Sequence, residues 1–156
     1  MAEGRTPEVK QLISITDTPY YHVVTRCVRR AFLAGYDKPT KTDFSHRRQW
    51  IVDKMMELCD IFSIHICSYA VMSNHYHMVL KVEENKLWTK TQTLRAWNKL
   101  YSLPYLCEKY LRGEITDYAE ERQVKKMAKK YRKRLMNISW FMKNSSGKNF
   151  HASPQG

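Results

Sequence analysis

Apolar residues recur with two different periods along the chain, and these periods predict both strands and helices. Residues 20–27, 64–72 and 75–82 are rich in β-branched and aromatic side chains, so each of these segments is predicted to be a strand. Only Ser73 and Asn74 separate the last two segments, and a gap of two residues predicts a hairpin. The sequence therefore predicts an antiparallel sheet that contains at least this hairpin.

The remaining segments are predicted to be mainly helical. A loop is expected at 28–42, followed by a helix at about 43–62, where apolar residues recur at helical spacing. Beyond the strands, a helical region is expected at about 84–135 as an insertion into a single domain that covers 1–143. The polar segment 144–156 has no period and is expected to be a disordered tail. The fold class that follows is α+β.

The charge of the chain favours a polyanionic partner. It has 27 Lys and Arg residues against 15 Asp and Glu residues, a net charge of +12 at pH 7. Such an excess raises the local concentration of polyanions, and nucleic acid is the commonest of them. A basic excess can also serve only to keep a domain from aggregating. Charge alone does not distinguish DNA from RNA.

The cysteines and the lengths of the apolar runs indicate the cellular compartment in which the protein is expected. The four cysteines include no Cys-x-x-Cys pair, and no signal peptide is recognised before them, which favours reduced thiols in a cytoplasmic protein. No apolar run approaches the ~20 residues that cross a bilayer, so we expect no membrane partner.

A basic helix is the first candidate for a nucleic-acid contact. Residues 122–134 contain eight basic residues and no acidic one, while the apolar residues among them keep helical spacing. A lysine-rich helix can equally present an ordinary solvated face. The candidates for DNA binding on this helix are Lys125, Lys126, Lys129 and Lys130.

Two histidines are the candidates for metal binding. Successive side chains of a strand point to opposite faces, so His75 and His77 share one face of the third strand while Tyr76 faces the other way. Two imidazoles on a rigid strand can fix two coordination positions of a divalent cation and leave the others open for substrate oxygens. A His-x-His triplet is also compatible with two unremarkable surface histidines.

The first strand and the loop after it carry further polar candidates. Arg26, Arg29 and Arg30 could contact phosphate, because the guanidinium fork matches phosphate geometry, or they could be ordinary surface charge. His22 and Arg26 are four residues apart on one strand and therefore face the same side of the sheet. His22 suits either a role near the metal or a structural, hydrogen-bonded histidine.

Three segments resemble a known family. Residues 70–80, which read Ala-Val-Met-Ser-Asn-His-Tyr-His-Met-Val-Leu, resemble the hairpin of the HUH single-strand DNA transposases, especially the REP-associated tyrosine transposases. Residues 21–26, followed by two arginines and by Phe32 and Leu33, are similar to the opening strand and loop of that family. Residues 138–143 resemble the start of its nucleophile helix. The resemblance covers roughly 19–82 and this short later piece.

The resemblance implies a fold, a partner and a mechanism. It implies a ferredoxin-like antiparallel sheet with helices packed on it, acting as a homodimer on single-stranded or hairpin DNA. In that mechanism His75 and His77 hold Mg²⁺ or Mn²⁺, usually with a third polar ligand. The metal polarises the scissile phosphate, and a tyrosine hydroxyl attacks phosphorus to form a 5′-phosphotyrosine link.

The chain departs from the family where the nucleophilic tyrosine is expected. About two helical turns beyond residues 138–143 the family has its tyrosine, whereas no Tyr follows Lys143 here, so we expect a C-terminally truncated relative. Tyr131 is the candidate for a substitute nucleophile, although its apolar neighbours also suit a side chain that faces the core. Three functions remain open: an active transposase, an inactive relative that binds DNA, and a ferredoxin-like RNA-binding module.

Overall fold

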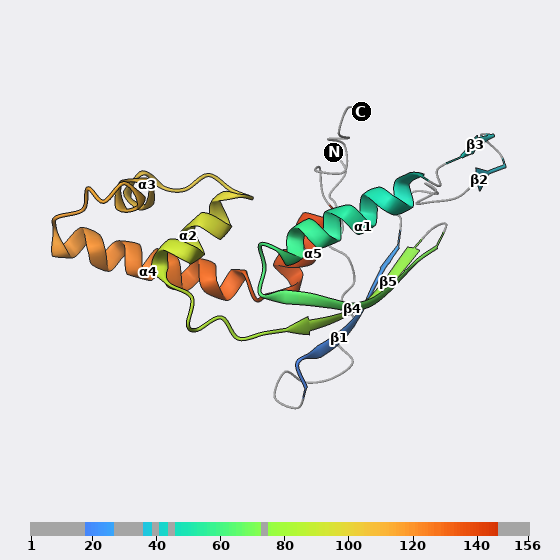
Figure 1. Cartoon of the computed structure of the whole chain (residues 1–156), viewed down its shortest axis with the longest axis horizontal. Coiled ribbons are helices and arrows are strands. Elements are labelled where there is room, and N and C mark those ends of the chain that lie inside the picture. Colours follow the sequence, from blue (N-terminus) through green and yellow to red (C-terminus); the bar gives the residue numbers. More distant parts are fainter. Residues whose placement is uncertain (1–17, 27–35, 39–40, 44–45, 73–74, 147–156) are drawn as a thin grey trace.

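Three antiparallel strands form the central sheet of the computed structural model, which describes residues 18–26, 36–38, 41–43, 46–72 and 75–146 (Figure 1). β1 (Tyr20–Arg26), β5 (His75–Val82) and β4 (Ile64–Val71) lie side by side in that order, so β5 is the central strand. β1 pairs with β5 along its whole length. β4 and β5 form the predicted hairpin, with a register shift between Ile66 and Ser68.

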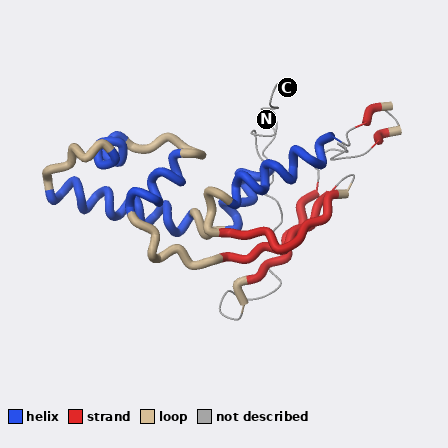
Figure 2. Tube along the Cα trace, viewed as in Figure 1, coloured by secondary structure: helices blue, strands red, loops and turns tan. Residues whose placement is uncertain are grey.

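Two helices cover one face of this sheet. α1 (His46–Cys59) and α5 (Ile138–Ser146) lie on the same side of the three strands, and the opposite face carries no helix within the described residues (Figure 2). The predicted α+β class, an antiparallel sheet with helices packed on it, is confirmed. β1, α1, β4, β5 and α5 follow one another in the order of the first five elements of the β-α-β-β-α-β ferredoxin-like motif, and the motif's last strand is not found among the described residues. The core between sheet and helices contains Val23, Ile51, Met55, Leu58, Tyr76, Met78, Leu80, Phe141 and Met142.

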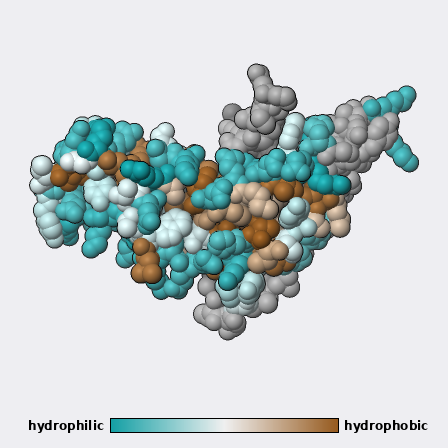
Figure 3. All heavy atoms as spheres, viewed as in Figure 1, coloured by the Kyte–Doolittle hydropathy of each residue, from teal (hydrophilic) through white to brown (hydrophobic). Residues whose placement is uncertain are grey.

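Three further helices form a separate group beyond the end of the sheet at which β5 finishes (Figure 1). They are α2 (Lys90–Asn98), α3 (Tyr105–Leu111) and α4 (Tyr118–Arg134). α2 starts with a capping box in which Thr89 accepts a hydrogen bond from the backbone N–H of Gln92. Asp117 caps α4 by accepting from the N–H of Ala119. The surface of this group is mostly hydrophilic (Figure 3).

Hydrogen bonds join the end of α4 to the end of the sheet. The backbone N–H of Ser63, just before β4, donates to the carbonyl oxygen of Leu135 over 2.8 Å. The side-chain amide of Asn85, just after β5, donates to the carbonyl oxygen of Arg132 over 2.8 Å. Asn85 is buried, and a buried amide without a partner would be costly. These bonds place the C-terminal end of α4 beside the end of the hairpin that lies away from His75.

The structure corrects three boundaries. The helix predicted at 43–62 is shorter, because it begins at His46 and ends at Cys59. The loop predicted at 28–42 contains part of a small two-stranded sheet, β2 (Tyr36–Asp37) and β3 (Thr42–Asp43). These strands have two residues each, too few for a period to show in the sequence.

The tail predicted to begin at 144 is also wrong at its start, because α5 continues to Ser146. Asn144 and Ser145 are buried. The amide of Asn144 donates to the carbonyl oxygen of Trp140 and contacts the hydroxyl of Tyr101, and these partners allow a polar side chain to be buried. Residues 147–156 lie outside the described part of the chain.

None of the described helices is both long and apolar enough to cross a membrane.

The central strand should dominate the stability of the fold. Leu80 is fully buried between the sheet and its helices, so Leu80→Ala should lower the free energy of unfolding by about 2–5 kcal/mol. Its neighbour Val79 faces the open side of the sheet, and Val79→Ala should cost about 1 kcal/mol or less. Urea denaturation of both variants checks this contrast. Equal losses would show that the face of β5 opposite α1 and α5 is also buried.

Candidate metal and nucleic-acid site

The alternation of β5 places both candidate metal ligands on the open face of the sheet. Tyr76 and Met78 are buried beneath the helices, whereas His75 and His77 are only partly buried. Their ring centres are 5.0 Å apart, and the ring planes meet at 73°. The two imidazoles therefore lie next to each other at the end of β5 where the hairpin turns.

A third histidine joins this pair from β1. Nε2 of His22 lies 3.1 Å from Nδ1 of His77, within hydrogen-bond distance. The contact follows from the strand register, in which His77 is opposite Val24 and His22 is opposite Val79. The two histidines are thus diagonal neighbours on adjacent strands, within reach of each other's side chains. The alternation of β1 predicts that His22 shares a face with Arg26, but it does not predict the contact with His77, because that contact depends on the strand register.

Of the three predicted arginines, only Arg26 belongs to the described residues, and only through its backbone. The backbone of Arg26 pairs with that of His75 at the end of β1, which brings β1 to the same end of the sheet as the histidines. The position of the Arg26 side chain lies outside the described structure. Arg29 and Arg30 also fall outside the described residues.

The donors at this site suit a cation with two protein ligands and several open positions. No group of three or more His, Cys, Asp or Glu side chains is arranged to hold an ion within the described part of the chain. Imidazole nitrogen is a softer ligand than the carboxylate and water oxygens that Mg²⁺ prefers. Mn²⁺ also prefers oxygen ligands but, as a first-row transition metal, accepts imidazole nitrogen more readily than Mg²⁺, so of the two predicted cations Mn²⁺ is the better match to a pair of histidines.

The predicted basic helix is α4, and its charged face is exposed. One side of the helix packs into the core through Val124, Ala128 and Tyr131. The carboxylates of its first turn are paired with lysines of neighbouring helices: Glu120 with Lys109 at 3.0 Å and Glu121 with Lys90 at 3.2 Å. Beyond this turn α4 has no acidic residue, and most of its basic side chains are exposed. The four predicted lysines, Lys125, Lys126, Lys129 and Lys130, are all exposed on this face.

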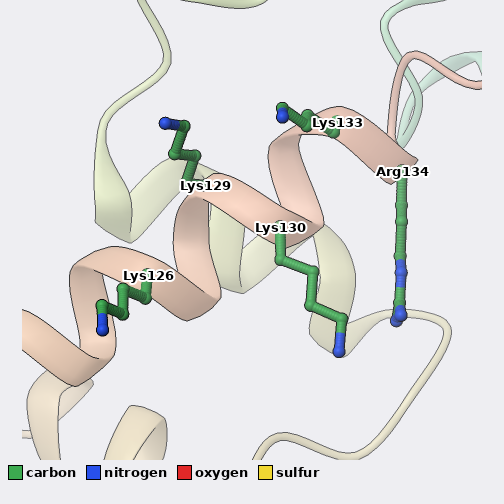
Figure 4. A pocket seen from close by; sticks show the side chains of 5 residues that line it. All are labelled: Lys126, Lys129, Lys130, Lys133 and Arg134. Carbon is green, nitrogen blue, oxygen red and sulfur yellow. The ribbon is translucent and has the colours of Figure 1, made fainter.

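A shallow hollow of about 380 Å³ lies along this basic face (Figure 4). In the view of Figure 4, Lys129 and Lys133 project to one side of the helix, and Lys130 and Arg134 to the other. Within the described residues, no carboxylate forms an ion pair with a side chain that lines the hollow. The lining side chains are Lys126, Lys129, Lys130, Lys133 and Arg134. The last two were not among the predicted residues, although they belong to the same basic run.

Aromatic rings hold Arg134 in place. Its guanidinium carbon lies 4.5 Å from the centre of the Trp140 ring and 5.5 Å from that of Trp97. A guanidinium group over an aromatic face is attracted by the ring quadrupole and loses none of its hydrogen-bond donors by stacking. Arg134 therefore presents an oriented positive group at one end of the hollow.

Tyr131, the candidate substitute nucleophile, belongs to the core. Its side chain is only 8% exposed, and its ring stacks on Trp97 with centres 4.6 Å apart. Burial raises the pKa of the Tyr131 hydroxyl. A tyrosine nucleophile needs both access to phosphorus and a means of losing its proton, and burial opposes both.

The structure also separates Tyr131 from the histidines. Tyr131 lies in the last turn of α4, which is bonded to the residues flanking the far end of the hairpin. His75 begins β5 and Val82 ends it, and seven steps along a strand span about 23 Å. The structure therefore brings together His22, His75 and His77, but does not bring Tyr131 to them.

No protein-family model, no curated protein and no solved structure matches this chain. The function is therefore inferred from the side chains of the open sheet face and of α4.

The burial of the Tyr131 side chain predicts a dependence of stability on pH. A phenol whose pKa is raised by folding stabilises the fold fully below its ordinary pKa of 10.0, and this contribution is lost as pH rises through the raised value. Tyr131→Phe should therefore make the decline in the free energy of unfolding above pH 10.0 shallower. Urea denaturation on both sides of that pH measures it, with the exposed Tyr118→Phe as the control. An unchanged decline would show that the hydroxyl reaches solvent.

Proposed function

We propose that this chain is a transposase-like protein that binds single-stranded or hairpin DNA and holds a divalent cation, Mg²⁺ or Mn²⁺, at His75 and His77. The observation that carries the proposal is the adjacency of the two imidazoles on the open sheet face, with ring centres 5.0 Å apart. Ligands on a strand are fixed by the backbone hydrogen bonds of the sheet. The solvent side of the cation would remain open to phosphate oxygens and water.

The cation and the basic helix would contribute differently to binding. A divalent cation at the histidines would stabilise the charge of one phosphate group. The lysines of α4 would attract several phosphates and release their counterions, which adds affinity that does not depend on base sequence. The net charge of +12 supports the same partner.

Binding without cleavage is the form of this function that the geometry favours. Cleavage would require a tyrosine oxygen to bond to phosphorus while the bond from phosphorus to the 3′ oxygen breaks and that oxygen gains a proton. Tyr131 is buried and lies at the far end of the hairpin from His75. An active transposase, a homodimer and an RNA-binding module stay predictions. The experiments below distinguish the active transposase and the RNA-binding module from the proposed function.

If His75 and His77 hold the cation, only the removal of these two histidines should abolish cation binding. His75→Ala together with His77→Ala should abolish Mn²⁺ binding, measured by the electron paramagnetic resonance signal of free Mn²⁺, because both proposed protein ligands are removed. The fold should persist, since both side chains lie on the open face. His46→Ala together with His65→Ala removes two exposed histidines elsewhere and should leave Mn²⁺ binding unchanged. Equal losses in the two variants would contradict the proposed ligands.

The basic face of α4 predicts a change in the salt dependence of DNA binding. Lys126→Gln together with Lys130→Gln should weaken binding to a labelled hairpin DNA and reduce the slope of log affinity against log salt by about 1 to 2. The matched control, Lys38→Gln with Lys86→Gln, removes the same charge from exposed positions outside the hollow. Its slope should stay close to that of the unaltered protein. Fluorescence anisotropy at several salt concentrations measures both slopes.

Binding to RNA and the trapping of a covalent adduct test the two competing functions. An RNA hairpin of equal length that binds more tightly than the DNA hairpin would favour the RNA-binding module. A covalent protein–DNA adduct on a denaturing gel in the presence of Mn²⁺ would establish cleavage and overturn binding alone. Equal slopes for the two lysine pairs would remove α4 from the proposed interface.

A further inference from the structure

The contact between His22 and His77 is a hydrogen bond between the edges of two rings. The nitrogens are 3.1 Å apart, whereas the ring centres are 5.2 Å apart and the planes differ by 14°. Two rings that lay face to face could not have centres so much farther apart than their nearest nitrogens. The rings therefore meet nearly in one plane, with Nε2 of His22 directed at Nδ1 of His77. This is the geometry of a good N–H···N hydrogen bond.

This geometry excludes His22 as a third ligand beside His77 Nδ1. A ring nitrogen coordinates through a lone pair in the ring plane, and here the two nitrogens point at each other rather than at a common third position. The described residues accordingly contain no group of three or more ligand side chains arranged around one point. His22 is instead placed to control which nitrogen of His77 carries the proton.

The position of that proton decides whether Nε2 of His77 can bind a cation. When Nδ1 of His77 carries the proton and donates to Nε2 of His22, Nε2 of neutral His77 keeps its lone pair. When Nε2 of His22 donates instead, neutral His77 carries its proton on Nε2 and has no lone pair there. Only the first arrangement allows Nε2 of His77 to coordinate.

We propose that His22 is a positioning residue for His77: its Nε2 accepts a hydrogen bond from Nδ1–H of His77 and so directs Nε2 of His77 toward the divalent cation. The inference rests on the proposed metal site. Histidine ligands of metals are commonly held in this way by an acceptor at the other ring nitrogen, and loss of the acceptor typically lowers metal affinity about 10- to 100-fold. Here the acceptor is a second imidazole supplied by the neighbouring strand.

The backbone of the sheet makes the arrangement rigid. β1 and β5 are paired from Tyr20 opposite Lys81 to Arg26 opposite His75, so the backbone positions of both histidines are fixed by the ladder. Both side chains are half-buried, which limits competition from water for the hydrogen bond.

Two variants of His22 and one control separate the proton-directing role from a merely structural one. His22→Leu removes the acceptor, whereas His22→Gln keeps an oxygen that can accept from Nδ1–H of His77. His65→Leu is the matched control, because His65 lies on β4 and pairs with Glu83 at 3.1 Å rather than with His77. Nitrogen-15 NMR of the metal-free full chain reports the tautomer of His77, and Mn²⁺ titration by electron paramagnetic resonance reports affinity.

We expect the Nδ1–H tautomer of His77 in the unaltered protein, in His22→Gln and in His65→Leu, and a shift toward the Nε2–H tautomer in His22→Leu. Mn²⁺ affinity should fall about 10- to 100-fold in His22→Leu and stay near that of the unaltered protein in the other two. If His22→Leu does not fold, His22→Asn replaces it, since its shorter amide cannot reach Nδ1 of His77. A predominant Nε2–H tautomer in the unaltered protein would overturn the role of His22.

The failure of this proposal is distinguishable from the failure of the metal site. If the unaltered protein binds Mn²⁺ and His22→Leu binds it equally well, the role of His22 is overturned while the metal site stands. If the unaltered protein does not bind Mn²⁺, the metal site is overturned, and the role of His22 falls with it.

Discussion

The strand β5 is the constraint on which the rest of the structure depends. It is the central strand, hydrogen-bonded on both sides, and its side chains alternate between a buried and an open face. Tyr76, Met78 and Leu80 are buried because α1 and α5 cover one face, and burial of such side chains is the main favourable contribution to folding. A shift of one residue in register would bury His75 and His77 and expose the apolar residues, so stability itself fixes where the histidines lie.

A second set of contacts decides what the helices beyond the sheet can do. The ring of Trp97 on α2 stacks on Tyr131 of α4, with ring centres 4.6 Å apart, and meets Trp140 of α5 at 5.6 Å. Aromatic pairs of this kind contribute about 0.5–1.5 kcal/mol beyond the burial of their surface. They join α2 and α4 to a helix that covers the sheet. The same contacts explain why Tyr131 is a core residue and why Arg134 stands in a fixed position beside the basic hollow.

Much of the fold was predictable from local pattern, because the relevant signals are short-range. The three main strands match their predicted segments to within one residue, and the basic amphipathic helix lies where the apolar spacing of residues 122–134 indicated. The contact between His22 and His77 was not predictable in this way. It depends on the register that places Val24 opposite His77, and no local pattern in either strand specifies that register. The burial of Asn144 likewise depends on Tyr101, which is 43 residues away in the sequence.

In the proposed function the histidines and the basic helix would act on a nucleic acid from different places. α4 joins the sheet at the end where β5 finishes, whereas the histidines lie near the start of β5. The two ends of β5 are about 23 Å apart. A duplex advances about 3.4 Å per base pair, so in the proposed complex the two regions would contact phosphates that lie several base pairs apart. Because each region would bind different phosphates, substitutions in one should change the affinity for DNA nearly independently of substitutions in the other. The proposed cation would therefore act on one phosphate locally, while α4 would hold a different stretch of the backbone, and neither contribution requires the other to be intact.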